Sequence, residues 1–286
     1  MKKSLSISFL TLLAVPFVMG QSPVFKNNLS NINPAMTGVV DKHFAMIQGR
    51  FIRSFDQLYY SFENQYEIGL DSINAGIGVN INFSKDHIFN NKSVRLKYGH
   101  SFQLKDELSL SVGASAGLNQ SEFRHGFSIN NSTIPSEYTL NSSTHFGSVG
   151  SIISWRGLTT GVSLLTSSRI ISSSDNNYVN QWSTFVWYDF EVTDNFKLAP
   201  SWIAQTDFNY QMHSFGLRGE HFNTFWWIAG YGFNKYSFDT TQLVNLGAGF
   251  QLAERINIGY ALLTDFNPNS FSNNLHLFTL AFRVGR

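Results

Sequence analysis

The stretch LSLSVGASAGL, from Leu108 to Leu118, indicates the fold class of this 286-residue chain. Its aliphatic residues alternate strictly with small polar residues, so an extended backbone places the two kinds on opposite faces. The stretches INAGIGVNINFS (73–84) and VNLGAGFQ (244–251) repeat the alternation. Each of them predicts a β-strand with one apolar face and one polar face.

Applied to the whole chain, this pattern predicts about fourteen strands, most of them long enough, at about 9–11 residues, to cross a membrane at a tilt. The links after even-numbered strands are short, and most links after odd-numbered strands are long, with 54–56 and 206–208 as short exceptions. Short periplasmic turns alternating with longer external loops are typical of outer-membrane barrels, so we expect both termini in the periplasm. The expected strands lie near 43–53, 57–68, 72–84, 92–103, 107–119, 145–156, 157–165, 180–191, 195–205, 209–219, 222–234, 241–251, 254–264 and 274–284.

Composition favours a surface that faces lipid. Charged residues make up 14% of the chain and aromatic residues 15%, whereas ordinary globular domains are about 25% charged. Trp182, Trp187, Trp226 and Tyr231 are candidates for interfacial girdles, although each taken alone is more often a packing residue than a lipid anchor. A soluble β-sandwich shares the alternation but rarely needs so many long strands. We therefore expect an all-β protein, an antiparallel transmembrane β-barrel in the cell outer membrane.

The N-terminus has the pattern of a secretory signal peptide. A basic start at Lys2-Lys3 precedes an apolar run and small residues before Gln21, and the run is too short for a membrane anchor. We expect a signal peptide over 1–20, an N-terminal periplasmic segment over 21–41 and the barrel over 42–286. The chain has no cysteine, which excludes disulfides, thiolate metal sites and lipid attachment.

Charge excludes nucleic acid as a partner. Removing the two lysines of residues 1–20 leaves 18 basic residues against 19 acidic ones, and phosphate backbones need a clear excess of basic residues.

Five charged residues are expected on the lumenal face of the strands: Glu63, Glu67, Arg95, Lys97 and Asp189. One interpretation is a network that binds a ligand or sets permeability. The alternative is the ion-paired, water-filled interior that is ordinary for a barrel.

No catalytic motif emerges. His100-Ser101 and His213-Ser214 are neighbours within strands, where successive side chains point to opposite faces, so neither pair can form a catalytic dyad. HExxH, GxSxG, P-loop and EF-hand spacings are missing from the sequence. Asx-rich stretches such as 267–274 favour turns over calcium binding. We expect no enzyme, no cofactor and no metal.

The link 120–144 is the longest, and its composition is unusual for a solvated loop. It combines Arg124 and His125 with the aromatic residues Phe123, Phe127 and Tyr138. Exposed clusters of aromatic residues with arginine are typical of binding surfaces, and long loops in compact domains tend to be functional. These five residues are the predicted partner-binding site, unless they fold down and close the barrel mouth.

The chain resembles the PorP/SprF family of outer-membrane proteins, which is associated with type IX secretion and gliding motility. The resemblance extends over almost all of 22–284. The first strand departs from the family pattern at Arg50 to Arg53, where the family has Arg-Asn-Gln-Trp, and so does Leu275 to Phe278, where it has Ser-His-Glu-Ile. The matching stretches are Ser22-Pro23-Val24-Phe25, Asn33-Pro34-Ala35-Met36-Thr37-Gly38, Ile73 to Phe83, Leu96-Lys97-Tyr98, Leu108 to Leu118, Leu198-Ala199-Pro200-Ser201, Trp227 to Tyr231 and Ile258-Gly259-Tyr260-Ala261.

The resemblance implies a barrel, surrounded by outer-membrane lipid, that helps to export or retain a partner protein at the cell surface. The implied partner is a secreted surface protein or adhesin with a C-terminal secretion domain, or periplasmic subunits of the secretion machinery. The alternative function is a passive porin or small-solute channel, whose sign would be a constriction loop inside an open lumen.

Overall fold

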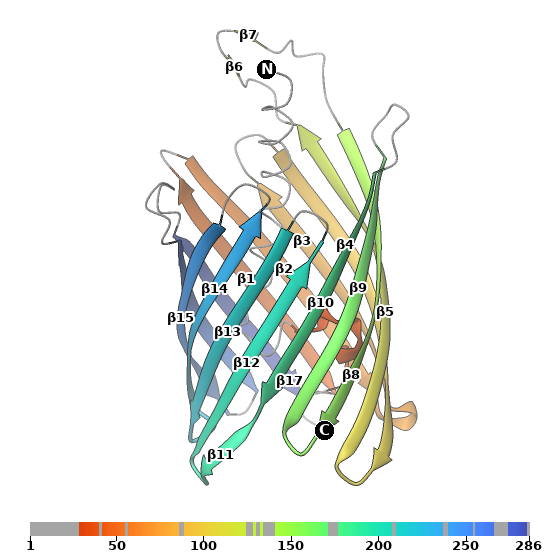
Figure 1. The fold of residues 1–286 in the computed structure, drawn as a ribbon, viewed down its shortest axis with the longest axis vertical. Helices are drawn as coiled ribbons and strands as arrows, with labels where there is room; N and C mark the ends of the chain where they lie inside the picture. Colours follow the sequence, from red (N-terminus) through yellow and green to blue (C-terminus); the bar gives the residue numbers. More distant parts are fainter. Residues whose placement is uncertain are drawn as a thin grey trace.

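A computed structural model describes residues 29–39, 42–54, 57–85, 89–123, 128–129, 132–133, 141–170, 177–207, 210–236, 240–253, 255–265 and 274–284. In these ranges the chain forms two short helices, then a large antiparallel sheet that includes a third short helix between two of its strands, and a separate two-stranded sheet (Figure 1). The elements are α2 (Leu29–Ile32), η2 (Pro34–Met36), β1 (His43–Ser54), β2 (Gln57–Leu70), η3 (Asp71–Ile73), β3 (Ala75–Lys85), β4 (Phe89–Lys105), β5 (Leu108–Phe123), β6 (Ser128–Ile129), β7 (Ser132–Thr133), β8 (Asn141–Trp155), β9 (Leu158–Ile170), β10 (Asn177–Tyr188), β11 (Phe190–Thr193), β12 (Phe196–Thr206), β13 (Tyr210–His221), β14 (Phe225–Tyr236), β15 (Thr240–Leu252), β16 (Ile256–Asp265) and β17 (Leu275–Val284).

The sheet closes into a barrel. β1 pairs with β17, and β10 pairs with β12, so the ladder is continuous around the ring. Counting β10 and β11 as one interrupted strand gives 14 strands, which confirms the predicted fold class and strand count. A closed ladder satisfies the backbone hydrogen bonds in a medium without water. Among the described residues, no helix is long and apolar enough to span a membrane.

Strand β10 is interrupted at Asp189, and the partner strand supplies a reason. β10 pairs with β12 as far as Trp187–Ser201, and the next residue of β12 is Pro200. Proline has no N–H to donate to the ladder. The Asp189 N–H instead donates to Gly157 O at 3.0 Å, and β11 continues beside β12 from the Phe190–Leu198 pair.

The two faces of the barrel wall are the reverse of those in a soluble protein. Large apolar side chains such as Leu96 (64% exposed) and Val149 (57% exposed) point outward, whereas polar side chains such as Gln48 and Gln205 are buried inside. A β-sandwich would bury the apolar face, so this distribution excludes that alternative.

The aromatic residues divide between the two faces. Trp182 (52% exposed) and Tyr231 (44% exposed) point outward, whereas Trp187 and Trp226 are buried in the lumen and cannot contribute to a girdle. The reason is strand parity, since Trp187 shares the inward face of β10 with buried Phe185. Outside, a row of contacting rings runs near the short-turn end through Phe196, His221, Phe225 and Phe250.

Candidate functional site: a plugged lumen

Residues 29–39 lie inside the barrel, where η2 contacts β4, β5 and β8 (Figure 1). This stretch, which we call the plug, belongs to the segment 21–41 that was expected in the periplasm, and the structure places it in the lumen. Its amphipathic composition explains the placement, since Leu29, Ile32 and Met36 are buried on one side while Ser30 and Asn31 meet polar wall residues on the other.

Asn33 anchors the plug in two ways. Its side-chain oxygen accepts from Ala35 N at 3.0 Å and so caps η2, whose first residue is Pro34. Both choices are typical of a helix start. The Asn33 amide also donates to Ser151 O and Val162 O on the wall, each at 3.0 Å. Asn33 is fully buried, so its hydrogen-bonding groups must be satisfied by protein.

A line of glycines on the inner wall lets the plug approach the backbone. Gly76, Gly99, Gly113 and Gly150 lie on β3, β4, β5 and β8, and each is the direct cross-strand partner of the next. We call this row the glycine line. A Cβ atom at Gly150 would lie 2.2 Å from Asn33 Oδ1, which is far inside contact distance.

The same closeness holds along the rest of the line. A Cβ at Gly113 would lie 2.4 Å from Ala35 N, and one at Gly76 would lie 2.5 Å from Gly38 Cα. Gly38 adopts a φ of +64°, a conformation that favours glycine and turns the chain out of the plug toward β1.

On one side of the plug stands a charged wall formed by inward residues of β1 to β4. Lys97 Nζ donates to Glu67 Oε1 at 2.8 Å, to Ser30 Oγ at 2.8 Å and to Asn31 Oδ1 at 3.1 Å. The Lys97 side chain is completely buried. The other oxygen of Glu67 accepts from Gly38 N at 3.0 Å. One lysine–glutamate pair therefore holds both ends of the plug.

The second ion pair of the charged wall is Arg50 with Glu63, and both side chains are buried. Glu63 Oε1 accepts from Asn80 at 2.7 Å and from the Asn31 amide of the plug. Arg95 donates to Asn31 O at 2.9 Å. The plug thus supplies polar groups that the buried charges need for solvation.

On the other side stands an apolar wall formed by β8, β10, β12 and β13. It packs against the apolar residues of the plug, and Phe185 stacks on Trp187 with 5.1 Å between ring centroids. Its wall residues are Ile152, Phe185, Trp187, Ile203 and Met212.

The structure brings four of the five predicted lumenal residues together: Glu63, Arg95 and Lys97 contact Asn31, and Glu67 binds Lys97. Asp189 lies elsewhere, at the break between β10 and β11, within electrostatic range of Arg218. Sequence reasoning missed Asn31, Asn33 and the glycine line. The only sequence signal for the plug was weak: the stretch Asn33 to Gly38 begins and ends with residues that favour turns.

The predicted partner-binding residues fall mostly outside the described residues. Arg124, His125, Phe127 and Tyr138 lie there, and Phe123 is described only as the backbone end of β5, paired with Phe89. The link itself is shorter than expected, because β5 continues to Phe123 and β8 begins at Asn141. Within the part of the chain that the structure describes, no group of His, Asp and Glu could hold a metal ion.

Solved structures with a similar fold are outer-membrane barrels. The CymD monoaromatic hydrocarbon channel matches with a TM-score of 0.64 at 11% identity, over 93% of this chain and 96% of that one. The toluene transporter TbuX of Ralstonia pickettii matches with a TM-score of 0.58 at 10% identity, over 92% and 96%. The toluene transporter TodX of P. putida matches with a TM-score of 0.56 at 9% identity, over 91% and 94%. At such identities the likeness shows the fold alone.

Sequence comparison is more specific. No curated protein matches the chain closely enough to count as a relative. The family model for the type IX secretion system membrane protein PorP/SprF, however, matches residues 20–282, which is nearly the whole chain. The chain is therefore an outer-membrane β-barrel that belongs to the PorP/SprF family of type IX secretion system membrane proteins.

Proposed function

We propose that this barrel binds one partner protein and helps to export it or retain it at the cell surface, as part of type IX secretion or gliding. Family membership is the observation that carries the proposal. The partner class is a secreted surface protein or adhesin with a C-terminal secretion domain, with periplasmic subunits of the machinery as further contacts.

The plug supports a binding role over a conducting one. It is held by hydrogen bonds to two buried ion pairs, by Asn33 and by close contact with the glycine line. Opening a path through the lumen would therefore break many contacts at once. A rigid closed barrel is a suitable base for binding through its loops, because rigid scaffolds commonly carry binding residues on loops. We therefore keep the link that contains Arg124, His125, Phe127 and Tyr138 as the proposed partner site.

The test replaces 124–140 by a short Gly-Ser turn in native cells. Because the described ladder pairs β5 with β8 up to Glu122–Asn141, the replacement leaves the wall intact. We expect a heat-modifiable barrel in the outer membrane and loss of the partner from the cell surface, measured by mass spectrometry of surface and released fractions. The matched control replaces 266–273, another link at the same end. A partner that stays attached in both strains would contradict the assignment of 124–140.

A passive channel is the second candidate, because the fold is shared with proteins named as hydrocarbon channels and toluene transporters. Liposomes containing the purified barrel separate the two functions. Swelling in a small-solute gradient by the unaltered protein would favour the channel, whereas tight liposomes together with partner capture from membranes would favour the binding role.

A further inference from the structure

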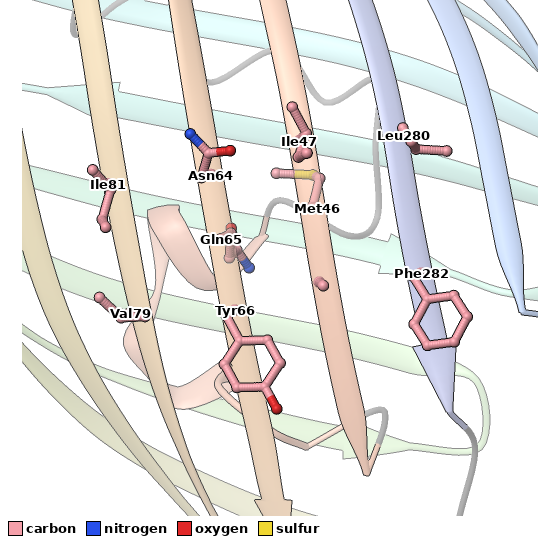
Figure 2. A pocket seen from close by; sticks show the side chains of 10 residues that line it. Met46, Ile47, Asn64, Gln65, Tyr66, Val79, Ile81, Leu280 and Phe282 are labelled. Carbon is pink, nitrogen blue, oxygen red and sulfur yellow. The ribbon is translucent and has the colours of Figure 1, made fainter.

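The lipid-facing wall has a hollow with a volume of about 320 Å³ on β17, β1, β2 and β3 (Figure 2). Its floor is Ala45, whose direct cross-strand partners are Tyr66 and Phe282. The two rings lie on either side of β1, and the methyl group between them leaves a depression. We call this depression the outer hollow. Its remaining outward lining residues are Ile47, Asn64, Val79, Ile81 and Leu280.

The lining of the outer hollow matches a hydrocarbon chain. Apart from the Tyr66 hydroxyl and the Asn64 amide, every outward side chain in it is hydrocarbon. Ile47 and Phe282 are 53% and 46% exposed, so both are open to the surrounding membrane. The molecules beside an outer-membrane barrel are lipids, and their acyl chains pack against apolar side chains by dispersion contacts.

The outer hollow lies in the periplasmic half of the barrel wall. β1 begins at His43, just before Ala45, and β17 ends just after Phe282, both on the short-turn side of the barrel. Short turns face the periplasm, so the lipids beside the hollow belong to the periplasmic leaflet. Asn64, which pairs with Ile47, marks the end of the hollow that is farther from the periplasm.

A pair of polar groups lies at the periplasmic edge of the hollow, on the side where a lipid carries its phosphate. The Tyr66 hydroxyl is directed toward the ends of β2 and β17 and lies 3.4 Å from His43 Nδ1 (Figure 2). Tyrosine is common at this depth, because its ring is apolar and its hydroxyl is polar. A hydroxyl group and an imidazole N–H both donate hydrogen bonds, and the oxygens of a phosphate or an ester accept them.

Lys42 and Arg255 flank the end of β17 beside the hollow. Lys42 N donates to Val284 O at 3.1 Å, and Arg283 N donates to Arg255 O at 2.7 Å. Lys42 and Arg255 are exposed, and neither forms an ion pair with a residue that the structure describes. Basic residues next to a membrane attract anionic head groups, so both charges favour a phosphate at this edge.

We propose that the outer hollow binds one phospholipid of the periplasmic leaflet. One acyl chain lies over Ala45 between the rings of Tyr66 and Phe282, and the phosphate accepts hydrogen bonds from the Tyr66 hydroxyl and from His43. The basic residues beside β17 supply the opposite charge. An apolar groove with a polar, basic edge at the depth of the head groups has the same order of chemistry as a phospholipid.

Native mass spectrometry of the barrel, purified from native membranes in mild detergent, tests the proposal. The unaltered protein should carry one added mass that fragments as a phospholipid. Ala45→Leu fills the floor of the hollow and should lower the retained phospholipid about tenfold, because about ten dispersion contacts with the chain are lost. The control is Ala114→Leu, at an outward alanine of β5 that pairs with Tyr98 and Val149, and it should retain the unaltered amount.

A second pair of variants tests the polar edge. Tyr66→Phe keeps the ring and removes the hydroxyl, so the retained phospholipid should fall about threefold, as for one hydrogen bond in a membrane. Tyr98→Phe is the control and should cause no loss, since the Tyr98 hydroxyl also lies 3.4 Å from a histidine nitrogen, His100 Nδ1, but does not line the outer hollow. Heat-modifiable migration confirms that each variant is folded.

Several results would overturn the proposed site. An unaltered protein that retains no phospholipid, or that retains an outer-leaflet glycolipid instead, would do so. Equal losses in a variant and its control would show that the retained lipid is not held in the hollow. No loss with Ala45→Leu would have the same meaning, and no loss with Tyr66→Phe would leave only a hydrocarbon chain in the hollow, which contradicts a phospholipid site.

Discussion

The charged wall and the apolar wall hold the same plug by different physical means. On the charged wall, Lys97 donates to Ser30 Oγ of the plug and Glu67 accepts from Gly38 N. Because hydrogen bonds are directional, these two residues fix the position of the plug. Phe185 and Ile203 on the apolar wall make contacts without direction, and they stabilise the plug by removing apolar surface from water. The difference teaches that one wall specifies where the plug lies while the other supplies stability that tolerates small shifts.

The glycine line should be the most sensitive place, because both walls depend on the plug reaching the backbone there. Gly113→Val puts carbon atoms where Ala35 N and Pro34 now lie, at 2.4 Å from the new Cβ. We expect the plug to leave the lumen, with a large rise in single-channel conductance in planar bilayers. Gly147→Ala is the control, since its Cβ would meet its nearest atom at 3.6 Å. Unchanged conductance for Gly113→Val would show that the plug does not close the lumen.

On the charged wall, Lys97→Met removes one partner of a buried ion pair. The loss leaves Glu67 without its cation, and we expect a free energy of unfolding lower by about 3–5 kcal/mol, as for other broken buried pairs. Urea titration of the barrel in detergent micelles measures it. The double variant Lys97→Met, Glu67→Gln should recover most of the loss, because no charge stays unpaired. A double variant as unstable as the single one would contradict this explanation.

On the apolar wall side, Met36→Ala truncates a buried plug residue. We expect a loss of about 2 kcal/mol, at the low end for such truncations, because the contacts without direction can readjust. The plug should stay in place, and protease protection of residues 29–39 in the folded barrel should be unchanged. Loss of protection with Met36→Ala but not with Lys97→Met would reverse the roles assigned to the two walls.

The smallest effect is expected for an ion pair outside the lumen. Arg156 and Glu107 join two short turns, with side chains 68% and 58% exposed. Glu107→Gln should change the free energy of unfolding by less than about 1 kcal/mol, since exposed pairs contribute little. The same urea titration measures the free energy of unfolding of both variants. If Glu107→Gln and Lys97→Met lose the same amount, burial does not explain why the lumenal ion pair matters more than the exposed one.

The sequence by itself determined the barrel. Period-two alternation is a local property, so stretches such as Leu108 to Leu118 show their two faces without tertiary information. Link lengths are local as well, and they predicted that the short turns gather at one end of the barrel. The same alternation of side chains between the two faces predicted that Glu63, Glu67, Arg95 and Lys97 point into the lumen.

Only the tertiary structure decided what those inward residues meet. The glycine line spans 75 residues of sequence, from Gly76 to Gly150. Its four glycines become neighbours only once the strand register is fixed. The plug has no strong signal in the sequence, because a segment such as 29–39 is too short to be stable alone and gains its order from the closed barrel around it. Lumenal contacts join residues far apart in the chain, and periodicity cannot encode them.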